Sequence, residues 1–291
     1  MNMTLECIPC FLRQTMEVVR LAKVDEGDQE RILRKVLLRL AEVSFQQSPP
    51  RLATIIHAEI RQELGSEDPY REVKKRSNLL ALELYEQMRQ QVNDSADPFE
   101  TAVRLAIAGN IIDFGQGYTP ERQQVVEGIK QAMVQQLPTA MLASLRSAVA
   151  RAKRIVYLGD NAGEIVFDRL LIEQMVPEKT VFVVRGGPVL NDATIEDAEA
   201  AGLQQLVKVV DNGSNAPGTI LEFCSPSFQE LFWRADLIIA KGQGNYETLC
   251  DVAAPVFFLL KVKCPVIARR LGRQMGEQVI VSTDRADHGS E

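Results

Sequence analysis

The chain changes its hydrophobic pattern at about residue 150, and this change constrains the fold more than any other feature. Beyond it, short runs rich in Val, Ile, Leu and Phe alternate with segments of helical spacing. Such runs occur at 155–158, 181–184, 207–210, 237–239, 256–260 and 279–281. Continuous apolar strands separated by helices are typical of a mainly parallel sheet covered on both faces. We therefore predict a Rossmann-like α/β/α core over residues 151–291.

Residues 1–150 show helical spacing instead, as in the series Ile32, Val36 and Leu40. Three segments, at 48–50, 68–69 and 97–98, join a capping residue to an early proline, and this pattern starts helices. We predict six or seven helices and no strand here, forming a helical N-terminal subdomain. The polar segment 283–291 is predicted to be a frayed tail.

Composition excludes several classes of protein. The 291 residues carry a net charge of −6, and both halves are slightly acidic, so the basic footprint of a nucleic-acid binder is missing. No apolar run approaches the ~20 residues that span a bilayer. The first ten residues lack the layout of a secretory signal. We expect a cytoplasmic protein with neither a nucleic-acid nor a membrane partner.

Histidine and cysteine usage limits the chemistry further. The two histidines are His57, which we interpret as structural, and His288 near the C-terminus, so a His-rich zinc site or a Ser-His-Asp triad is disfavoured. Five cysteines without a signal peptide argue against a disulfide framework. The close pair Cys7 and Cys10 is half a zinc site, a redox pair or two small buried residues at a helix start, and all three interpretations stay open.

Polar and glycine-rich residues follow each of the first five predicted strands. Because ligands of open parallel sheets bind at the carboxyl ends of the strands, we expect the site at this edge. Asp160 and Asn161 follow the first strand, and Asp192 follows the second. Together they offer three oxygen ligands, which suit Mg²⁺ or Mn²⁺ better than zinc. The alternative is that these residues only cap the helices that follow.

Two lysines at strand ends suggest an anion. Lys241 precedes the glycine-rich segment Gly242-Gln243-Gly244, which we interpret as a loop whose N–H groups approach a phosphate, and Lys261 ends the next strand. The segment has neither the Walker nor the GxGxxG spacing. Snorkelling of a lysine from a buried strand is the structural alternative. The unusual segment 109–115 ends a helix and could bring Asn110 or Asp113 to the same cleft.

These residues form an ordered series of motifs that resembles the metal-dependent damage-control phosphatase family, formerly a domain of unknown function, in its CxxC-containing prokaryotic-type subfamily. The resemblance spans about residues 4 to 282. The motifs are CxxC at 7–10, GNIIDF at 109–114, GDNAGE at 159–164, RGGP at 185–188 with Asn191-Asp192, KGQGNYE at 241–247 and LKVKC at 260–264.

The resemblance implies a helical part on a Rossmann-like core, a divalent metal (Mn²⁺, Ni²⁺, Co²⁺ or Mg²⁺) and hydrolysis of small phosphorylated metabolites such as sugar phosphates or damaged side products. By motif match, the metal ligands are Asp160, Asn161 and Asp192. Glu164, Lys261 and Lys241 with its Gly242-Gln243-Gly244 segment are implied at the phosphate.

We therefore predict a metal-dependent phosphomonoester hydrolase, with nucleotides as further candidate substrates. Lys241, Lys261 and the helix start at Ala162 are expected to neutralise the phosphate charge. The acid or base stays unassigned between Glu164 and Asp192. Two alternatives stay open: an S-adenosylmethionine-dependent methyltransferase, and a non-catalytic nucleotide- or metabolite-binding protein.

Overall fold

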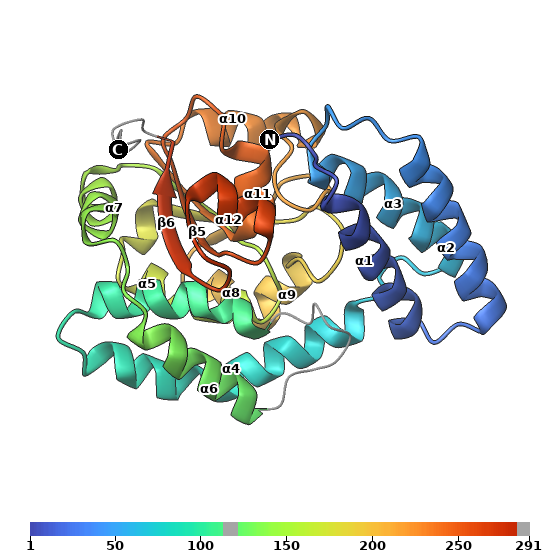
Figure 1. Cartoon of the computed structure of the whole chain (residues 1–291). Helices are drawn as coiled ribbons and strands as arrows, with labels where there is room; N and C mark the ends of the chain where they lie inside the picture. The colour runs from blue at the N-terminus through green and yellow to red at the C-terminus, as the bar shows by residue number, and fades with distance from the viewer. Residues whose placement is uncertain (113–121, 284–291) are drawn as a thin grey trace.

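The computed structural model describes residues 1–112 and 122–283 (Figure 1). Asp113 and His288 lie outside these residues. The helices of the first half are α1 (Cys7–Leu21), α2 (Glu26–Ala41), α3 (Pro49–Leu64), α4 (Arg71–Asn93), α5 (Pro98–Ala108), the 3-10 turn η1 (Gly109–Ile112), α6 (Arg122–Val134) and α7 (Thr139–Arg151). No strand occurs before residue 150 in the described part, as predicted.

The second half alternates strands and helices, which confirms the predicted fold class. The strands are β1 (Ile155–Leu158), β2 (Thr180–Val184), β3 (Lys208–Asp211), β4 (Leu237–Lys241), β5 (Val256–Lys261) and β6 (Gln278–Ser282). The longer helices between them are α8 (Glu164–Glu173), α9 (Ile195–Ala200), α10 (Pro226–Trp233), α11 (Gly242–Leu249) and α12 (Pro265–Leu271).

The six strands form one sheet in the order β3-β2-β1-β4-β5-β6. The first five are parallel, and β6 is antiparallel to β5. β1 therefore lies centrally between β2 and β4, so the residues after these strands meet at one edge. The edge strand β3 departs from the predicted continuous burial, since Lys208 and Asp211 at its ends are exposed.

Side chains alternate across the sheet and build a core on each face. Ile155 and Tyr157 of β1 join a core shared with α4–α9. Val156 and Leu158 join the opposite core, which includes residues of α10, α11 and α12. Helices α1–α3 enclose a third core of their own, and Figure 1 shows them as a group at one side of the sheet. The helices before residue 150 thus contribute to two cores, and the boundary at 150 stays a prediction.

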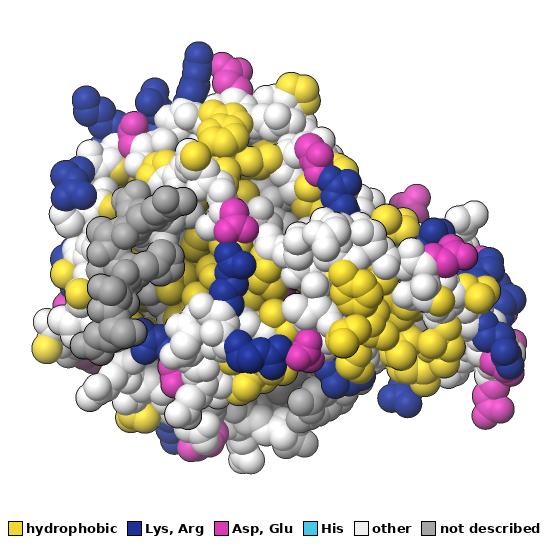
Figure 2. Space-filling model, turned by 45° about the horizontal axis from the view of Figure 1, so that its top comes forward, with side chains coloured by type: hydrophobic (Ala, Val, Ile, Leu, Met, Phe, Trp, Pro, Cys, Tyr) yellow, Lys and Arg dark blue, Asp and Glu magenta, His cyan; other side chains and the backbone are white. Residues whose placement is uncertain are grey.

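The surface carries both signs of charge. Figure 2 shows basic and acidic side chains interspersed over one face, and hydrophobic side chains gathered on the lobe that α1–α3 form. Within the described residues, no helix combines the length and the apolar character needed to cross a bilayer.

Candidate functional site

The loops after β1 and β2 are joined by backbone contacts. The Ala193 N–H donates to the Asp160 carbonyl oxygen (2.8 Å), and the Ala162 N–H donates to the Asn191 carbonyl oxygen (2.9 Å). Asn161 and Asp192 form an isolated antiparallel bridge. Asp160, Asn161 and Asp192 therefore lie side by side at the carboxyl edge of the sheet, each at most 8% exposed.

The helix-capping alternative for these three residues does not hold. Gly163, with a φ of 79°, precedes α8, and no side chain caps that helix. Helix α9 is capped by Thr194, which forms a reciprocal capping box with Asp197. Neither helix therefore uses the side chain of Asp160, Asn161 or Asp192 as its cap.

A buried arginine, to which the sequence analysis gave no role, connects the two aspartates. The Arg185 guanidinium, 2% exposed, donates through Nε to Asp192 Oδ2 at 2.6 Å and lies 3.6 Å from Asp160 Oδ1. Its Nη1 contacts Thr219 Oγ1 and Asn245 Oδ1 at 3.4 and 3.5 Å. Arg185 follows β2 directly, so the strand-end position that pointed to Asp160 could also have indicated it.

Glu164 is buried and connects several polar side chains around the site. Its Oε2 accepts from Asn161 Nδ2 at 3.0 Å and from Asn110 Nδ2 at 2.9 Å. Asn110, one of the two residues of segment 109–115 considered from the sequence, therefore contacts Glu164. Asp168, one turn further along α8, accepts from the Tyr157 hydroxyl at 2.8 Å. Burial raises the pKa of Asp168 to about 6.

The structure places Lys241 beneath the site. Its fully buried Nζ donates to Asp168 Oδ1 (2.6 Å), Glu164 Oε1 (2.7 Å) and the Ala106 carbonyl oxygen (2.8 Å). Burial opposes the charged form of Lys241, but the two carboxylates outweigh this and raise its pKa. Three acceptors satisfy all three donors of an ammonium group, so Lys241 neither snorkels nor has a proton left for a phosphate in this arrangement.

The segment predicted as a glycine loop is instead the first turn of α11. Gly242 has a φ of 77°, and a Cβ at this position would stand 1.8 Å from Asp160 Oδ2. Glycine is therefore needed because the Asp160 carboxylate packs against the start of the helix. The first N–H groups of a helix lack intrahelical partners, so this turn supplies donors beside Asp160. At α8, by contrast, the N–H groups of Ala162 and Gly163 are already donated to Asn191 O and Asn78 Oδ1.

Replacing Gly242 by alanine is expected to displace the Asp160 carboxylate. If Asp160 holds a metal, as the motif match implies, the variant should lose at least about tenfold of the metal-dependent phosphate release predicted from the sequence. Gly272→Ala is the matched control, because Gly272 also has a positive φ (60°) but no atom lies within 4 Å of its Cβ position. Both variants share the backbone strain of about 1–2 kcal/mol. Steady-state kinetics and thermal melts of the two variants make the comparison, and equal activities would contradict the role given to Gly242.

Lys261 lies at the end of β5, the strand next to β4. Burial and the neighbouring Lys263 lower the pKa of Lys261, and no carboxylate pairs with it among the described residues. The positive charge of Lys263 also acts on Asp160, but it does not offset the burial that raises the pKa of this carboxyl group. Lys261 thus carries positive charge at the same edge of the sheet as the carboxylates, since it ends the strand next to β4.

Asn78 of α4 supports the site from the helical half. Its Oδ1 accepts from the Gly163 N–H at 2.7 Å, and its Nδ2 donates to Asp197 Oδ1 at 3.0 Å. Asp197 also pairs with Lys74, and the side chains of Lys74, Asn78 and Asp197 are buried. Sequence reasoning missed this contact because Asn78 and Gly163 are 85 positions apart.

The charges and donors of the site fit a divalent cation. Counted in their ionised forms, four buried carboxylates (Asp160, Glu164, Asp168, Asp192) face two buried cations (Lys241, Arg185), a formal excess of two negative charges that a divalent cation would balance. Burial, Asp192 and Glu164 raise the pKa of Asp160 well above its usual range. In residues 1–112 and 122–283, no group of three or more His, Cys, Asp and Glu side chains is arranged to hold a metal. The three predicted ligands are not such a group, because they contain only two carboxylates and the third ligand is the Asn161 amide.

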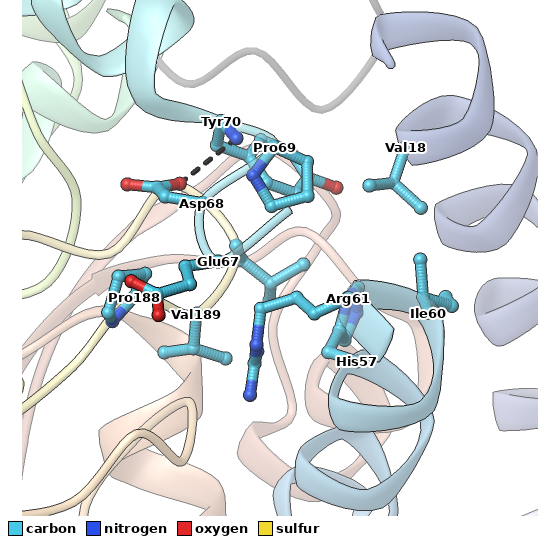
Figure 3. Close-up of a pocket in the computed structure, with 11 residues that line it drawn as sticks. Val18, His57, Ile60, Arg61, Glu67, Asp68, Pro69, Tyr70, Pro188 and Val189 are labelled. Carbon is cyan, nitrogen blue, oxygen red and sulfur yellow. Dashed lines mark hydrogen bonds between the residues drawn. The ribbon is translucent and has the colours of Figure 1, made fainter. Parts of the chain in front are cut away.

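A small pocket lies between α3 and the loop after β2 (Figure 3). His57 lines it with Arg61, Pro188 and Val189, and the Tyr70 N–H donates to Asp68 Oδ1 at 3.0 Å. Burial, assisted by Arg61, lowers the pKa of His57 to about 4, so its imidazole is neutral at pH 7. This environment is that of a structural histidine, in line with the interpretation from sequence.

Glu247, on the second turn of α11, gives a pH dependence that can be measured. Burial raises its pKa from 4.5 to about 7. A carboxyl group whose pKa is higher in the folded than in the unfolded protein lowers the free energy of unfolding as it ionises. It has no such effect below its unfolded pKa and its full effect above its folded pKa. Ionisation of Glu247 therefore lowers the free energy of unfolding as the pH rises from about 4.5 to 7.

We expect Glu247→Gln to raise the free energy of unfolding at pH 8 by up to about 3 kcal/mol and to change it little at pH 4.5. Urea titrations at both pH values test this, with the exposed Glu127→Gln as control. An equal effect of Glu247→Gln at the two pH values would show that the carboxylate charge is not the cause.

Fold and site together define a Rossmann-like α/β protein with an acidic, amide-containing site at the carboxyl edge of its sheet. The family model described as the damage-control phosphatase ARMT1-like domain matches residues 3–279. The chain therefore belongs to this damage-control phosphatase family, as the resemblance of its motifs predicted, and it is related to hydrolases.

Individual relatives agree over nearly the whole chain. It is 37% identical to damage-control phosphatases of Pyrococcus horikoshii and Archaeoglobus fulgidus; the alignments cover 93% and 94% of this chain and 94% and 96% of the relatives. An uncharacterised protein of Methanocaldococcus jannaschii is 34% identical over 95% of this chain and 94% of its own length. The crystal structure of a DUF89 family protein from P. horikoshii superposes with a TM-score of 0.87 at 34% identity, covering 98% of this chain and all of that chain.

Proposed function

We propose that the chain is a metal-dependent phosphatase that hydrolyses phosphate monoesters of small metabolites. The observation that carries this proposal is the combination at one sheet edge of Asp160, Asn161 and Asp192 with Lys261, which pairs with no described carboxylate. Family membership and the damage-control phosphatases among the relatives support the same reaction class.

Asp160, Asn161 and Asp192 would hold the metal through two carboxylates and an amide oxygen. When bound, such an ion supplies Lewis-acid polarisation of a phosphoryl oxygen. Arg185 fixes the Asp192 carboxylate through the 2.6 Å contact and restrains Asp160 from the same side. Gly242 lets the Asp160 carboxylate lie against the start of α11.

Lys261 and the first N–H groups of α11 are the donors that would bind the phosphate in this proposal. Donors fixed in place before the reaction stabilise charge that develops on the equatorial oxygens. Lys241 does not contact the phosphate in this proposal; it pairs with Glu164 and Asp168 and holds them in position. Glu164 and Asp192 remain the candidates for moving a proton.

The organic part of the substrate has space next to Arg185. A cavity of about 520 Å³ lies there between the segments 66–71, 185–188 and 194–196. This volume is in the range typical of small-molecule sites. Acidic side chains, including Glu67 and Asp211, line it together with Arg71, so the cavity suits a polar metabolite rather than an apolar one.

A phosphate-release screen tests the proposal. Sugar phosphates and nucleotides are incubated with the protein in EDTA and with Mn²⁺, Ni²⁺, Co²⁺ or Mg²⁺. We expect release of inorganic phosphate only with metal. Metal-stabilised ligand binding without release would favour a binding protein, and metal-independent binding of S-adenosylmethionine would favour a methyltransferase; either result contradicts the proposal.

A further inference from the structure

The segment Cys7-Ile8-Pro9-Cys10 takes no part in the site described above. It forms the first turn of α1, which begins at Cys7. Residues three apart in a regular helix have Cα atoms about 5 Å apart. This separation lies within the range of about 4.4–6.8 Å that a disulfide requires. A disulfide between Cys7 and Cys10 is therefore compatible with the helix, and both thiols are free in the structure.

The two thiols differ in access and surroundings. Cys10 is half-buried, and Gln14 Nε2 lies 4.0 Å from its Sγ. Burial raises the pKa of the Cys10 thiol, and Arg13 only partly offsets this effect. Cys7 is 8% exposed, and its Sγ lies 3.9 Å from Thr4 Oγ1. Because Cys10 is the more accessible of the two thiols, a small disulfide reaches it first, and Cys7 has the position of a buried resolving thiol.

The charge of a buried carboxylate, that of Glu247, acts on this pair. The N-terminal segment packs on α11, where the Met1 ammonium donates to the Glu247 carbonyl oxygen at 3.2 Å. Burial and then the Glu247 charge raise the pKa of Cys7. Glu247 titrates near neutral pH, as derived above. A carboxyl group with such a pKa beside a buried thiol is suited to accept its proton.

We propose that Cys7 and Cys10 form a redox-active dithiol that exchanges with low-molecular-weight disulfides, with Glu247 as the proton acceptor for Cys7. The Cys10 thiolate attacks one sulfur of the disulfide, which forms a mixed disulfide and releases one thiolate. Cys7 gives its proton to Glu247 and attacks the Cys10 sulfur, which releases the second thiolate. Both released thiolates take up protons. The protein loses two electrons and the small disulfide gains them.

Incubation of the full-length reduced protein in mixtures of reduced and oxidised glutathione tests this proposal. Thiols are alkylated, and the peptides are identified by mass spectrometry. We expect one two-electron transition that removes two thiols from the peptide containing residues 7–10. Cys7→Ser should stop at a mixed disulfide of glutathione on Cys10, and Cys10→Ser should leave Cys7 reduced.

Glu247→Gln should slow the decay of the mixed disulfide about tenfold or more and flatten its pH dependence around pH 7. Cys250→Ser, at the half-buried end of α11, is the matched control and should behave as the parent protein. Three results would overturn the proposal: five thiols that stay reduced throughout, a disulfide from Cys10 to Cys264, or stoichiometric metal that blocks the thiols of the purified protein.

Discussion

Asp160→Asn is expected to abolish metal-dependent phosphate release while raising the stability of the metal-free protein. The substitution removes the charge of one proposed metal ligand and keeps the shape of the side chain. Loss of an outer-shell partner already costs about 10- to 100-fold, so loss of a direct ligand should cost at least about 100-fold in kcat/KM. Burial and the charges of Asp192 and Glu164 raise the pKa of Asp160, so its ionised form opposes folding when no cation is bound.

The two effects in opposite directions separate a ligand from a structural residue. Thermal melts in EDTA should show a midpoint at or above that of the parent protein, and added Mn²⁺ should raise the midpoint of the parent only. The exposed Asp94→Asn serves as the control for a generic loss of one charge. Parent-like activity in Asp160→Asn, or a lowered midpoint in EDTA, would refute the role proposed for Asp160.

The strands could be predicted because buried parallel strands appear as continuous apolar runs, such as 155–158 and 256–260. The direction of β6 could not, since an apolar run carries no information about parallel or antiparallel pairing. The exposed ends of β3 follow from its place at the edge of the sheet, which only the strand order determines. The local hydrophobic pattern thus predicts where the strands lie in the sequence better than it predicts which strands pair in the sheet.

The candidate site shows the same division. Asp160, Asn161 and Asp192 were predicted to lie together because each follows a strand, and the structure brings them together. The glycines at 242 and 244 indicated a loop, since glycine disfavours helices. Tertiary contact overrides this preference, because the φ of Gly242 and its closeness to Asp160 exclude a side chain.

Lys241 marks the limit of reasoning from strand ends. That position makes a lysine look accessible to a ligand, yet its partners Glu164, Asp168 and Ala106 are 77, 73 and 135 positions away. No local pattern encodes these pairings. Asn78 and Gly163 form a second case, and only the packing of α4 beside α8 brings them together.

Lys241→Met is therefore expected to act mainly on stability. The substitution keeps much of the apolar stem but leaves Glu164 and Asp168 without their cation in a fully buried place. Removing one partner of a buried ion pair costs about 3–5 kcal/mol. Urea unfolding measures this change, and Lys130→Met on the exposed face of α6 should change the free energy of unfolding by less than about 0.5 kcal/mol.

Two further measurements identify the buried charge as the cause. The double variant Lys241→Met with Asp168→Asn should be more stable than Lys241→Met, because it removes one of the uncompensated carboxylates. The destabilisation should also shrink as the pH falls from 8 toward 5, since burial raises the pKa of Asp168 to about 6 even with Lys241 present. Without the lysine this pKa must rise further, and protonation then relieves the cost of burying the charge. If Lys241 instead contacted the phosphate directly, Lys241→Met would raise KM at nearly unchanged stability, and the double variant would restore nothing.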